Sequence, residues 1–484
     1  MKTLQQDMTT GSPAKTILNF TLPIFIGNVF QQFYNMADTV IVGKFVGTKA
    51  LAAVGSTGTI MFLIIGFVLG MTAGFTVLTA QKFGAGDMKA MRQTVGGAAI
   101  LSLIMSIILT VVSMAFMKPL LRFMQTPSDI FADAYAYIMI ICAGIVAQML
   151  YNLLACILRA LGNSRIPLYF LILSAVLNII LDLLFIVVFG LGAAGAAYAT
   201  VVSQSVSGLL CLAYIVKKVP LLHLEKDDWK PKSYLLRTQL GIGFPMALQY
   251  SITAVGTMMV QTSLNLLGST AVAAFTAANK IEQVVTQAYV AMGTTMATYC
   301  AQNVGAGKVL RLRQGFKAAT LISAVYSVAV GVWILTGGKY MTYLFLSENV
   351  SEVIGLVDIY LKCAGIFFIP LAVVNIYRNG IQGMGYGLLP MTAGIIELAA
   401  RGITAWISSG YRSFAGVCMA GPAAWASAAL LLIGMYFYVM NHDMKKLQER
   451  YPQQQEEEGA GQTVPAGRKP GKAGRRRRAS HQPL

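Results

Sequence analysis

Apolar stretches long enough to cross a membrane recur along the whole chain, for example at 100–117 and 170–189. A transmembrane helix needs about 20 apolar residues, so these stretches predict membrane spans. Hydrophobic residues make up 56% of the chain and charged residues only 12%, against about 25% charged in a soluble domain. The chain is therefore predicted to be an all-α integral membrane protein. When the polar, Gly and Pro residues between the apolar stretches are taken as boundaries, the chain has twelve predicted spans. They are centred near residues 30, 65, 105, 143, 176, 203, 252, 287, 324, 367, 398 and 428.

The net charge of +18 is distributed as membrane topology requires, and it does not point to a nucleic-acid partner. With a cytoplasmic N-terminus, 28 of the 37 Lys and Arg residues fall on the inner side, Arg378 among them. Only Lys280, Lys362 and Arg401 fall within spans. Cytoplasmic loops of membrane proteins carry such an excess of basic residues, so both termini are expected to be cytoplasmic.

The chain contains an internal repeat. AQKFGAGDMKAMRQ (80–93) and AQNVGAGKVLRLRQ (301–314) agree at seven of fourteen positions, at an offset of 221 residues. Further pairs keep the same order, so each half is expected to be a six-span unit. Six is an even number, so the two six-helix lobes should be related by a pseudo-two-fold axis along the membrane normal. The predicted parts are a cytoplasmic N-terminus (1–14), an N-terminal lobe (15–216), a cytoplasmic loop (217–237), a C-terminal lobe (238–441) and a disordered basic tail (442–484).

Catalysis within the membrane is not expected. The three histidines, His223, His442 and His481, lie outside the predicted spans, which excludes a histidine-ligated metal or a histidine base there. The GAG turns lack the Lys-Ser/Thr and the strand context of a phosphate-binding loop. We therefore expect no enzyme, no metal site and no cofactor.

Candidate functional residues stand where the two halves differ. Ionisable groups inside a membrane are costly and usually serve transport. Asp38 lies in the first span and Asp182 in the fifth, with Asn178 one helical turn before Asp182. Two carboxylates in a dry site repel each other, so the pair is expected to take up H⁺ or to hold Na⁺, helped by oxygens of Asn152, Asn178 and Thr200. The alternative is that these side chains only tie helices together.

The C-terminal half carries charges of its own. Glu282 follows Lys280 by two residues, and it could attract a cationic substrate or be neutralised by a neighbour. Glu397 and Arg401 are four residues apart, the spacing of an intrahelical ion pair. Tyr34, one turn before Asp38, is the aromatic candidate for a substrate contact. Pro23 is a candidate hinge, because a proline inside a helix removes a backbone hydrogen bond; the alternative is that it lies close enough to the helix start to be tolerated there.

Several motifs together resemble the multidrug and toxic-compound extrusion (MATE) family of secondary transporters, nearer its bacterial DinF/MepA-like branch. The resemblance implies two six-helix lobes in a V shape and export of cationic or amphipathic compounds against H⁺ or Na⁺ across the plasma membrane. It also implies an ion site at Asp38, Asn152, Asn178, Asp182 and Thr200, although another amide expected in the fourth span is Ala155 here. In this family, bending of the first span responds to protonation, which implies a role for Pro23. The motifs are ADTVIVGKFVGTKALAAVG in the first span, QKFGAG and QNVGAG after the second and eighth, and RALGNSRIP before the fifth.

Two functional hypotheses stay open on the sequence alone. The first is an ion-coupled multidrug exporter that works by alternating access as a monomer, with small-molecule substrates and the lipid bilayer as its partners. The alternative is a flippase for a lipid-linked oligosaccharide, which would favour a strongly cationic cavity. The conspicuous acids of the N-terminal half favour export.

Overall fold

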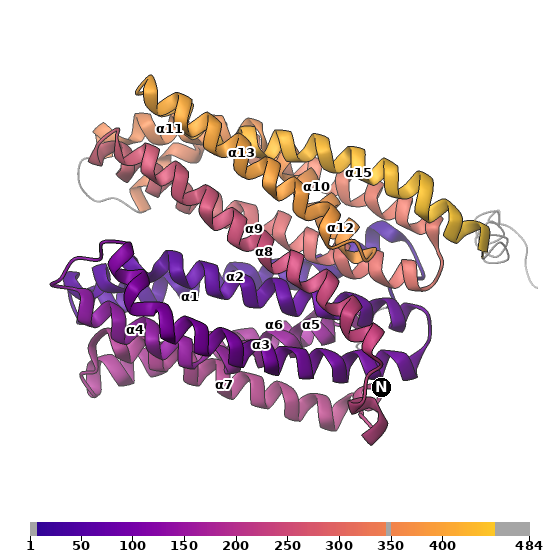
Figure 1. Cartoon of the computed structure of the whole chain (residues 1–484). Helices are drawn as coiled ribbons and strands as arrows, with labels where there is room; N and C mark the ends of the chain where they lie inside the picture. The colour runs from indigo at the N-terminus through magenta and orange to yellow at the C-terminus, as the bar shows by residue number, and fades with distance from the viewer. Residues whose placement is uncertain (1–6, 345–349, 451–484) are drawn as a thin grey trace, which may run out of the picture.

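A computed structural model describes residues 7–344 and 350–450. The N-terminal half consists of long helices that run up and down in sequence order and form one lobe (Figure 1). They are α1 (Pro13–Phe45), α2 (Thr48–Gly84), α3 (Met88–Phe123), α4 (Phe131–Ala143), α5 (Ile145–Ala160), α6 (Arg165–Asp182) with the π-helical turn η1 (Leu183–Val188), and α7 (Gly192–Lys218).

The C-terminal half repeats this order in a second lobe after a short connection with two 3₁₀ turns, η2 (Pro220–Leu222) and η3 (Lys226–Trp229). Its elements are α8 (Ser233–Asn265), α9 (Ser269–Gly305), α10 (Val309–Gly337) with the 3₁₀ turn η4 (Gly338–Leu344), α11 (Val350–Ile366), α12 (Phe368–Gly383), α13 (Leu388–Gly410), and α14 (Phe414–Cys418) followed by α15 (Ala420–Arg450).

These elements make twelve spans. Among the described residues, seven helical segments are long and apolar enough to cross a membrane, and two bent pairs, α4–α5 and α11–α12, bring the number to nine. The other three are α1, α8 and α9, which are 33, 33 and 37 residues long. At 1.5 Å per residue each of them exceeds the roughly 30 Å of a hydrocarbon core. All three lie where the lobes meet, and their lower hydropathy is consistent with this position inside the protein.

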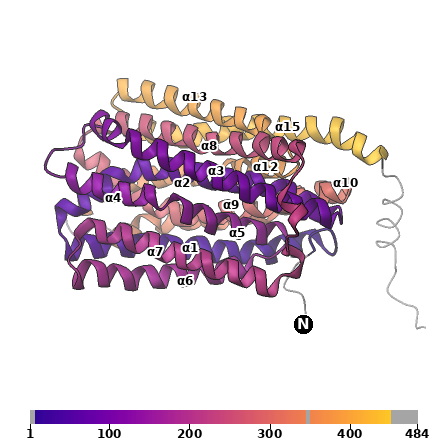
Figure 2. The ribbon, with the colours of Figure 1, turned by 60° about the horizontal axis from the view of Figure 1, so that its bottom comes forward.

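The boundaries of the lobes differ slightly from those predicted. Helix α1 starts at Pro13. Helix α15 continues to Arg450, past the predicted lobe boundary at 441, and the remainder of the predicted tail, 451–484, lies outside the described residues. Both described chain ends lie at the same end of the molecule (Figures 1 and 2). Because the two GAG turns lie there too, we call it the GAG end.

The two repeated turns interlock at the GAG end. A Cβ atom on Gly84 would lie 2.1 Å from the carbonyl oxygen of Gln302, and a Cβ atom on Gly305 would lie 1.9 Å from the carbonyl oxygen of Gln81. Gln81 and Gln302 are equivalent residues of the repeat, as are Gly84 and Gly305, at the offset of 221. Each turn therefore needs its glycine because the backbone of the other turn passes directly over it.

The same glutamines join the lobes by hydrogen bonds related by the pseudo-symmetry. Gln302 Nε2 donates to Ala160 O at 2.8 Å, and Gln81 Nε2 donates to Gly383 O at 3.1 Å. The sequence indicated only that the GAG turns are not phosphate-binding loops. The structure adds that they hold the two lobes together.

The lobes separate away from the GAG end. A Cβ atom on Gly66 of α2 would lie 2.9 Å from Tyr250 Cβ, and one on Gly70 would lie 2.5 Å from Ala247 Cα, so α2 and α8 pack backbone against backbone here. Gly55 lies on the same face of α2 as Gly66, about three turns away. A Cβ atom on Gly55 would meet nothing within 4 Å. The lobes are thus closed at the GAG end and apart at the opposite end.

Helix α1 belongs to both lobes. Ile17, Phe20 and Ile24 in its first half are part of the hydrophobic core of the C-terminal lobe. Ile41 and Val42 near its end are part of the core of the N-terminal lobe. Helix α1 therefore crosses from one lobe to the other along its length.

Helix α8 makes the reciprocal crossing, which is visible in Figure 1 as its oblique path between the lobes. Leu236, Leu240 and Ala247 in its first half pack in the core of the N-terminal lobe. Val260 and Leu264 pack with C-terminal residues. Pro23 and Pro245, aligned in the repeat, both lie inside these crossing helices.

Candidate functional site

Asp38 and Asp182 come together in the N-terminal lobe, in the half away from the GAG end. Asp182 ends α6 and is completely buried, and the π-helical turn η1 follows it; such turns are frequent at functional sites. The two carboxyl groups lie within hydrogen-bonding range of each other. A shared hydrogen bond between two carboxyl groups requires that one of them carries a proton.

The pair lacks the partners that a purely structural pair would need. Asp38 Oδ1 and Asp182 Oδ1 are buried without a hydrogen-bond donor. None of the ion pairs among the described residues includes either aspartate. An unpartnered buried carboxylate oxygen carries a desolvation cost, and a proton or a cation bound between the two groups would relieve that cost.

The Asn178 amide connects Asp182 to helix α7. With its NH₂ group turned to Asp182, it donates to Oδ2 at 3.0 Å and accepts from the Thr200 N–H at 3.2 Å. Turned the other way, it donates to the Thr200 hydroxyl at 3.3 Å. Asn178 is 1% exposed. The structure therefore places the predicted residues Asn178 and Thr200 in direct contact with each other and next to Asp182.

Two tyrosines complete the cluster. Tyr34 hydrogen-bonds to the Thr200 side chain and lies within electrostatic reach of Asp38 and Asp182. It was predicted as a substrate contact, and the structure places it beside the carboxylates. Tyr137 of α4, also within electrostatic reach of both aspartates, is 2% exposed and donates to Met61 Sδ at 3.5 Å. Sequence reasoning missed Tyr137, whose only signal was an aromatic residue with a polar group inside an apolar span.

Asn152 is not joined to this cluster by a hydrogen bond in the part of the chain that the structure describes. Its side-chain amide donates to Gln148 O of its own helix at 2.8 Å. Such a bond within one turn satisfies the amide donor locally, and the Asn152 oxygen stays available as a cation ligand.

Glu282 lies in the C-terminal lobe and has its own partners. The Tyr360 hydroxyl donates to Glu282 Oε2 at 2.5 Å, and Asn279 Nδ2 donates to the Tyr360 oxygen at 3.2 Å. Arg401 contributes an attractive charge, whereas Lys280 is exposed. Of the two readings of Glu282, the contacts favour a carboxylate stabilised by its neighbours.

The Glu397–Arg401 pair forms as its spacing predicted, at 3.4 Å. A second arginine, Arg378, lies 2.6 Å from the same carboxylate. Arg378, counted above with the basic residues of the inner side, lies within α12, close to its C-terminal end. The three side chains are 9–11% exposed. One carboxylate thus faces two guanidinium groups, and the cluster carries a net positive charge.

The chemistry of the two lobes therefore differs in kind. The N-terminal lobe holds two adjacent carboxyl groups without a cationic partner, an arrangement able to bind and release a proton or a small cation. The C-terminal lobe holds carboxylates that already have donors. No group of three or more His, Cys, Asp or Glu side chains able to hold a metal ion occurs in residues 7–344 and 350–450.

Replacing Tyr137 by Phe is expected to reduce ion-driven transport a few-fold without unfolding the protein. The change removes one polar group beside the carboxylates and keeps the ring in its packed position. Tyr135→Phe, two residues away and stacked on Phe131, is the matched control. Initial rates in vesicles measure the effect, and equal rates for the two variants would remove Tyr137 from the site.

Comparison with known proteins decides the family. The MatE family profile matches residues 23–184 and again 242–407, once in each half and over more than half of the chain. The chain belongs to the MATE family. The first match contains Asp38, Asn178 and Asp182. MATE proteins are multi-span membrane transporters, which agrees with the twelve spans of this chain.

Similar MATE proteins and structures extend over most of the chain. It is 33% identical over 378 residues to the probable multidrug resistance protein YpnP of Bacillus subtilis, covering 78% of this chain and 83% of that one. It is 25% identical over 399 residues to the FAD transporter of Shewanella oneidensis, covering 80% and 88%. A solved MATE transporter of the MOP superfamily, described as an outward-facing multidrug resistance protein, has a TM-score of 0.85 and 25% identity and covers 93% of this chain and 99% of that one.

Proposed function

We propose that this MATE protein is a secondary active exporter that exchanges cationic or amphipathic compounds for H⁺ or Na⁺. The observation that carries the proposal is the adjacent pair of Asp182, which is completely buried, and Asp38, which is half-buried, each with a buried carboxylate oxygen that has no donor and neither with a cationic partner. The names of relatives such as YpnP support multidrug compounds as substrates, and MATE transporters in general are cation-coupled antiporters.

The proposed cycle uses the crossing of α1 between lobes. Ion binding at Asp38 acts on the part of α1 that packs in the N-terminal lobe, while the part before Pro23 packs in the C-terminal lobe. A proline inside a helix removes a backbone hydrogen bond and permits bending. Pro23 therefore serves as the hinge through which ion binding changes the relation between the lobes.

We further propose that the GAG end is cytoplasmic and that the protein acts as a monomer in the plasma membrane. The excess of basic residues near this end supports the orientation. With that orientation, lobes that are closed at the GAG end and apart at the other end correspond to an outward-facing state. The similarity to a structure described as outward-facing agrees with this assignment.

The charge of the C-terminal lobe favours a second candidate substrate class. Arg378 and Arg401 share a single carboxylate, Glu397, and one relative is named an FAD transporter. An anionic nucleotide such as FAD therefore belongs in the transport assay beside the cationic compounds.

The test is efflux from vesicles that contain the purified protein. Ethidium or FAD is loaded, and either a pH gradient or a Na⁺ gradient is imposed. Gradient-driven loss of ethidium supports the proposal and identifies the ion, whereas driven loss of FAD alone supports the second candidate. Well-folded protein that moves neither compound under either gradient would contradict export and favour the flippase for a lipid-linked oligosaccharide.

A further inference from the structure

The residues just before α1 dock on the opposite lobe. Asp7–Ser12, which we call the N-terminal strap, precede a helix that carries Asp38 of the N-terminal lobe, yet Met8 is completely buried in the core of the C-terminal lobe. The Met8 N–H donates to Gln302 Oε1 at 3.1 Å, and Met8 O accepts from Asn303 Nδ2 at 3.2 Å. The strap thus lies on the last turns of α9.

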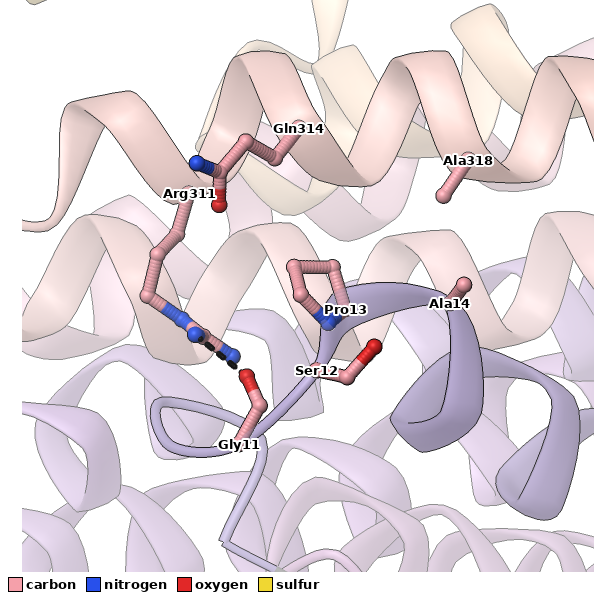
Figure 3. Close-up of a pocket in the computed structure, with 7 residues that line it drawn as sticks. All are labelled: Gly11, Ser12, Pro13, Ala14, Arg311, Gln314 and Ala318. Atoms are coloured by element: carbon pink, nitrogen blue, oxygen red, sulfur yellow. Dashed lines mark hydrogen bonds between the residues drawn. The ribbon is translucent and has the colours of Figure 1, made fainter. Parts of the chain in front are cut away.

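Arg311 of α10 is the anchor of the strap. Its guanidinium donates to Gly11 O at 2.8 Å and to Thr10 O at 3.1 Å, and also to Met8 O at 3.2 Å. Lys308 adds a bond to Thr9 O at 2.9 Å. Figure 3 shows the Arg311 side chain reaching across to Gly11. Both residues line a pocket of about 410 Å³.

The charge of Arg311 is compensated almost entirely by backbone carbonyl oxygens. The residue is 7% exposed, and its Nε donates to Asn303 Oδ1 at 3.1 Å. No ion pair of the described residues includes Arg311. A buried guanidinium that loses its acceptors is strongly destabilised. If the strap detached, water would therefore have to replace its carbonyl oxygens as acceptors for Arg311. The docked position of the strap and the burial of Arg311 therefore depend on each other.

The strap also touches the contact between the lobes. Gln302, which accepts from the Met8 N–H, donates to Ala160 O of the N-terminal lobe, and its carbonyl oxygen covers Gly84. Gln302 thus links the strap to α5 through its side chain and lies against α2 through its backbone, at the GAG end. Opening of this end would separate Gln302 from Ala160 and Gly84, and it would thereby disturb the last turns of α9, on which the strap lies.

The segment before α8 makes the corresponding contact in the other direction. Asp228 pairs with Arg92 of α3 at 3.1 Å, and a Cβ atom on Gly96 would lie 2.4 Å from Asp228 O. Each lobe is therefore held at the GAG end by the segment that leads into the other lobe.

We propose that the N-terminal strap is a latch: its docking on Arg311 keeps the lobes closed at the GAG end, and its release accompanies opening of that end. This inference rests on the alternating motion of the lobes proposed above. It assigns Arg311 to control of the conformational equilibrium, with no contact to ion or substrate.

The test measures opening without transport. In a version whose native cysteines are replaced, Ala301→Cys provides a reporter, because Ala301 is completely buried at the contact between the lobes, beside Ala80 and Ala160. We expect Arg311→Gln to speed maleimide labelling of this cysteine by about tenfold in lipid nanodiscs, since several hydrogen bonds to a charged group are lost. Arg313→Gln is the matched control, because Arg313 lies two residues further along α10 and is exposed. Equal labelling of the two variants would overturn the proposal.

A second variant covers the case in which Arg311→Gln is not recovered from the membrane. Gly11 has a φ of +73°, and a Cβ atom there would have its nearest contact at 3.9 Å, with Thr16 Oγ1. Gly11→Ala therefore strains the backbone of the strap without a clash at the added Cβ atom and without a change to α10. Faster labelling is expected here as well, and an unchanged rate would overturn the latch. Because labelling needs neither substrate nor ion gradient, its result is independent of whether the transport assay succeeds.

Discussion

Asp38→Asn is expected to reduce gradient-driven efflux to the level of vesicles without protein. Asparagine keeps the size of the side chain but can neither bind a proton nor supply a negative charge to a cation. The partner Asp182 would then lack the second carboxyl group with which it shares its site. The substitution leaves packing almost unchanged, so the protein should still reach the membrane in normal amount. Efflux of ethidium from energised vesicles, with the amount of inserted protein measured in parallel, checks the result.

The control for this variant is Asp133→Asn, which makes the same change at an exposed carboxylate in the first turn of α4. We expect its efflux to stay close to that of the unmodified protein. Full efflux by Asp38→Asn would refute the ion site in the N-terminal lobe, and equal loss in both variants would mean that a general effect of charge is responsible.

Gly84→Ala is expected to destabilise the closed GAG end and to reduce efflux. The added methyl group would lie 2.1 Å from the Gln302 carbonyl oxygen, which belongs to the backbone of a rigid helix and has no rotamer with which to move away. Overpacking of this kind typically costs about 1–3 kcal/mol. The lobes should therefore be forced apart at this end, and the thermal midpoint of the purified protein should fall.

Gly58→Ala makes the same exchange in the same helix where a Cβ atom would meet nothing within 4 Å. Alanine is the better helix former, so this control should be as stable as the unmodified protein or slightly more so. A midpoint for Gly84→Ala at or above that of the control would contradict the interlocked arrangement of the two turns.

The twelve spans and the two-lobe architecture could be predicted because hydropathy and the internal repeat are properties of the sequence itself. The closeness of Asn178 and Asp182 was also predictable, since they share a helical face, whereas the place of Thr200 beside them was implied by the resemblance to the MATE family. The role of Tyr137 was not, because an aromatic residue in an apolar span is ordinary until its neighbours are known.

The pairing of Arg378 with Glu397 could not be predicted, for a physical reason. The residue lies close to the end of α12, and the sequence carries no sign of the 49° bend between α11 and α12. Its partner Glu397 is nineteen residues away, beyond any local spacing rule. The interlocking of the GAG turns could not be predicted for a similar reason. The backbone that covers each glycine belongs to a residue more than two hundred positions away in the sequence.

The crossing of α1 and α8 has a consequence for how the chain is assembled. During synthesis the first seven helices emerge before α8, whose Leu236, Leu240 and Ala247 complete the N-terminal core. The core of that lobe consequently remains incomplete until α8 has been inserted. Helix α1 in turn stays without the core that buries Ile17 and Phe20. Each lobe is thus completed only by a helix from the other half of the chain, although the sequence reads as a simple duplication.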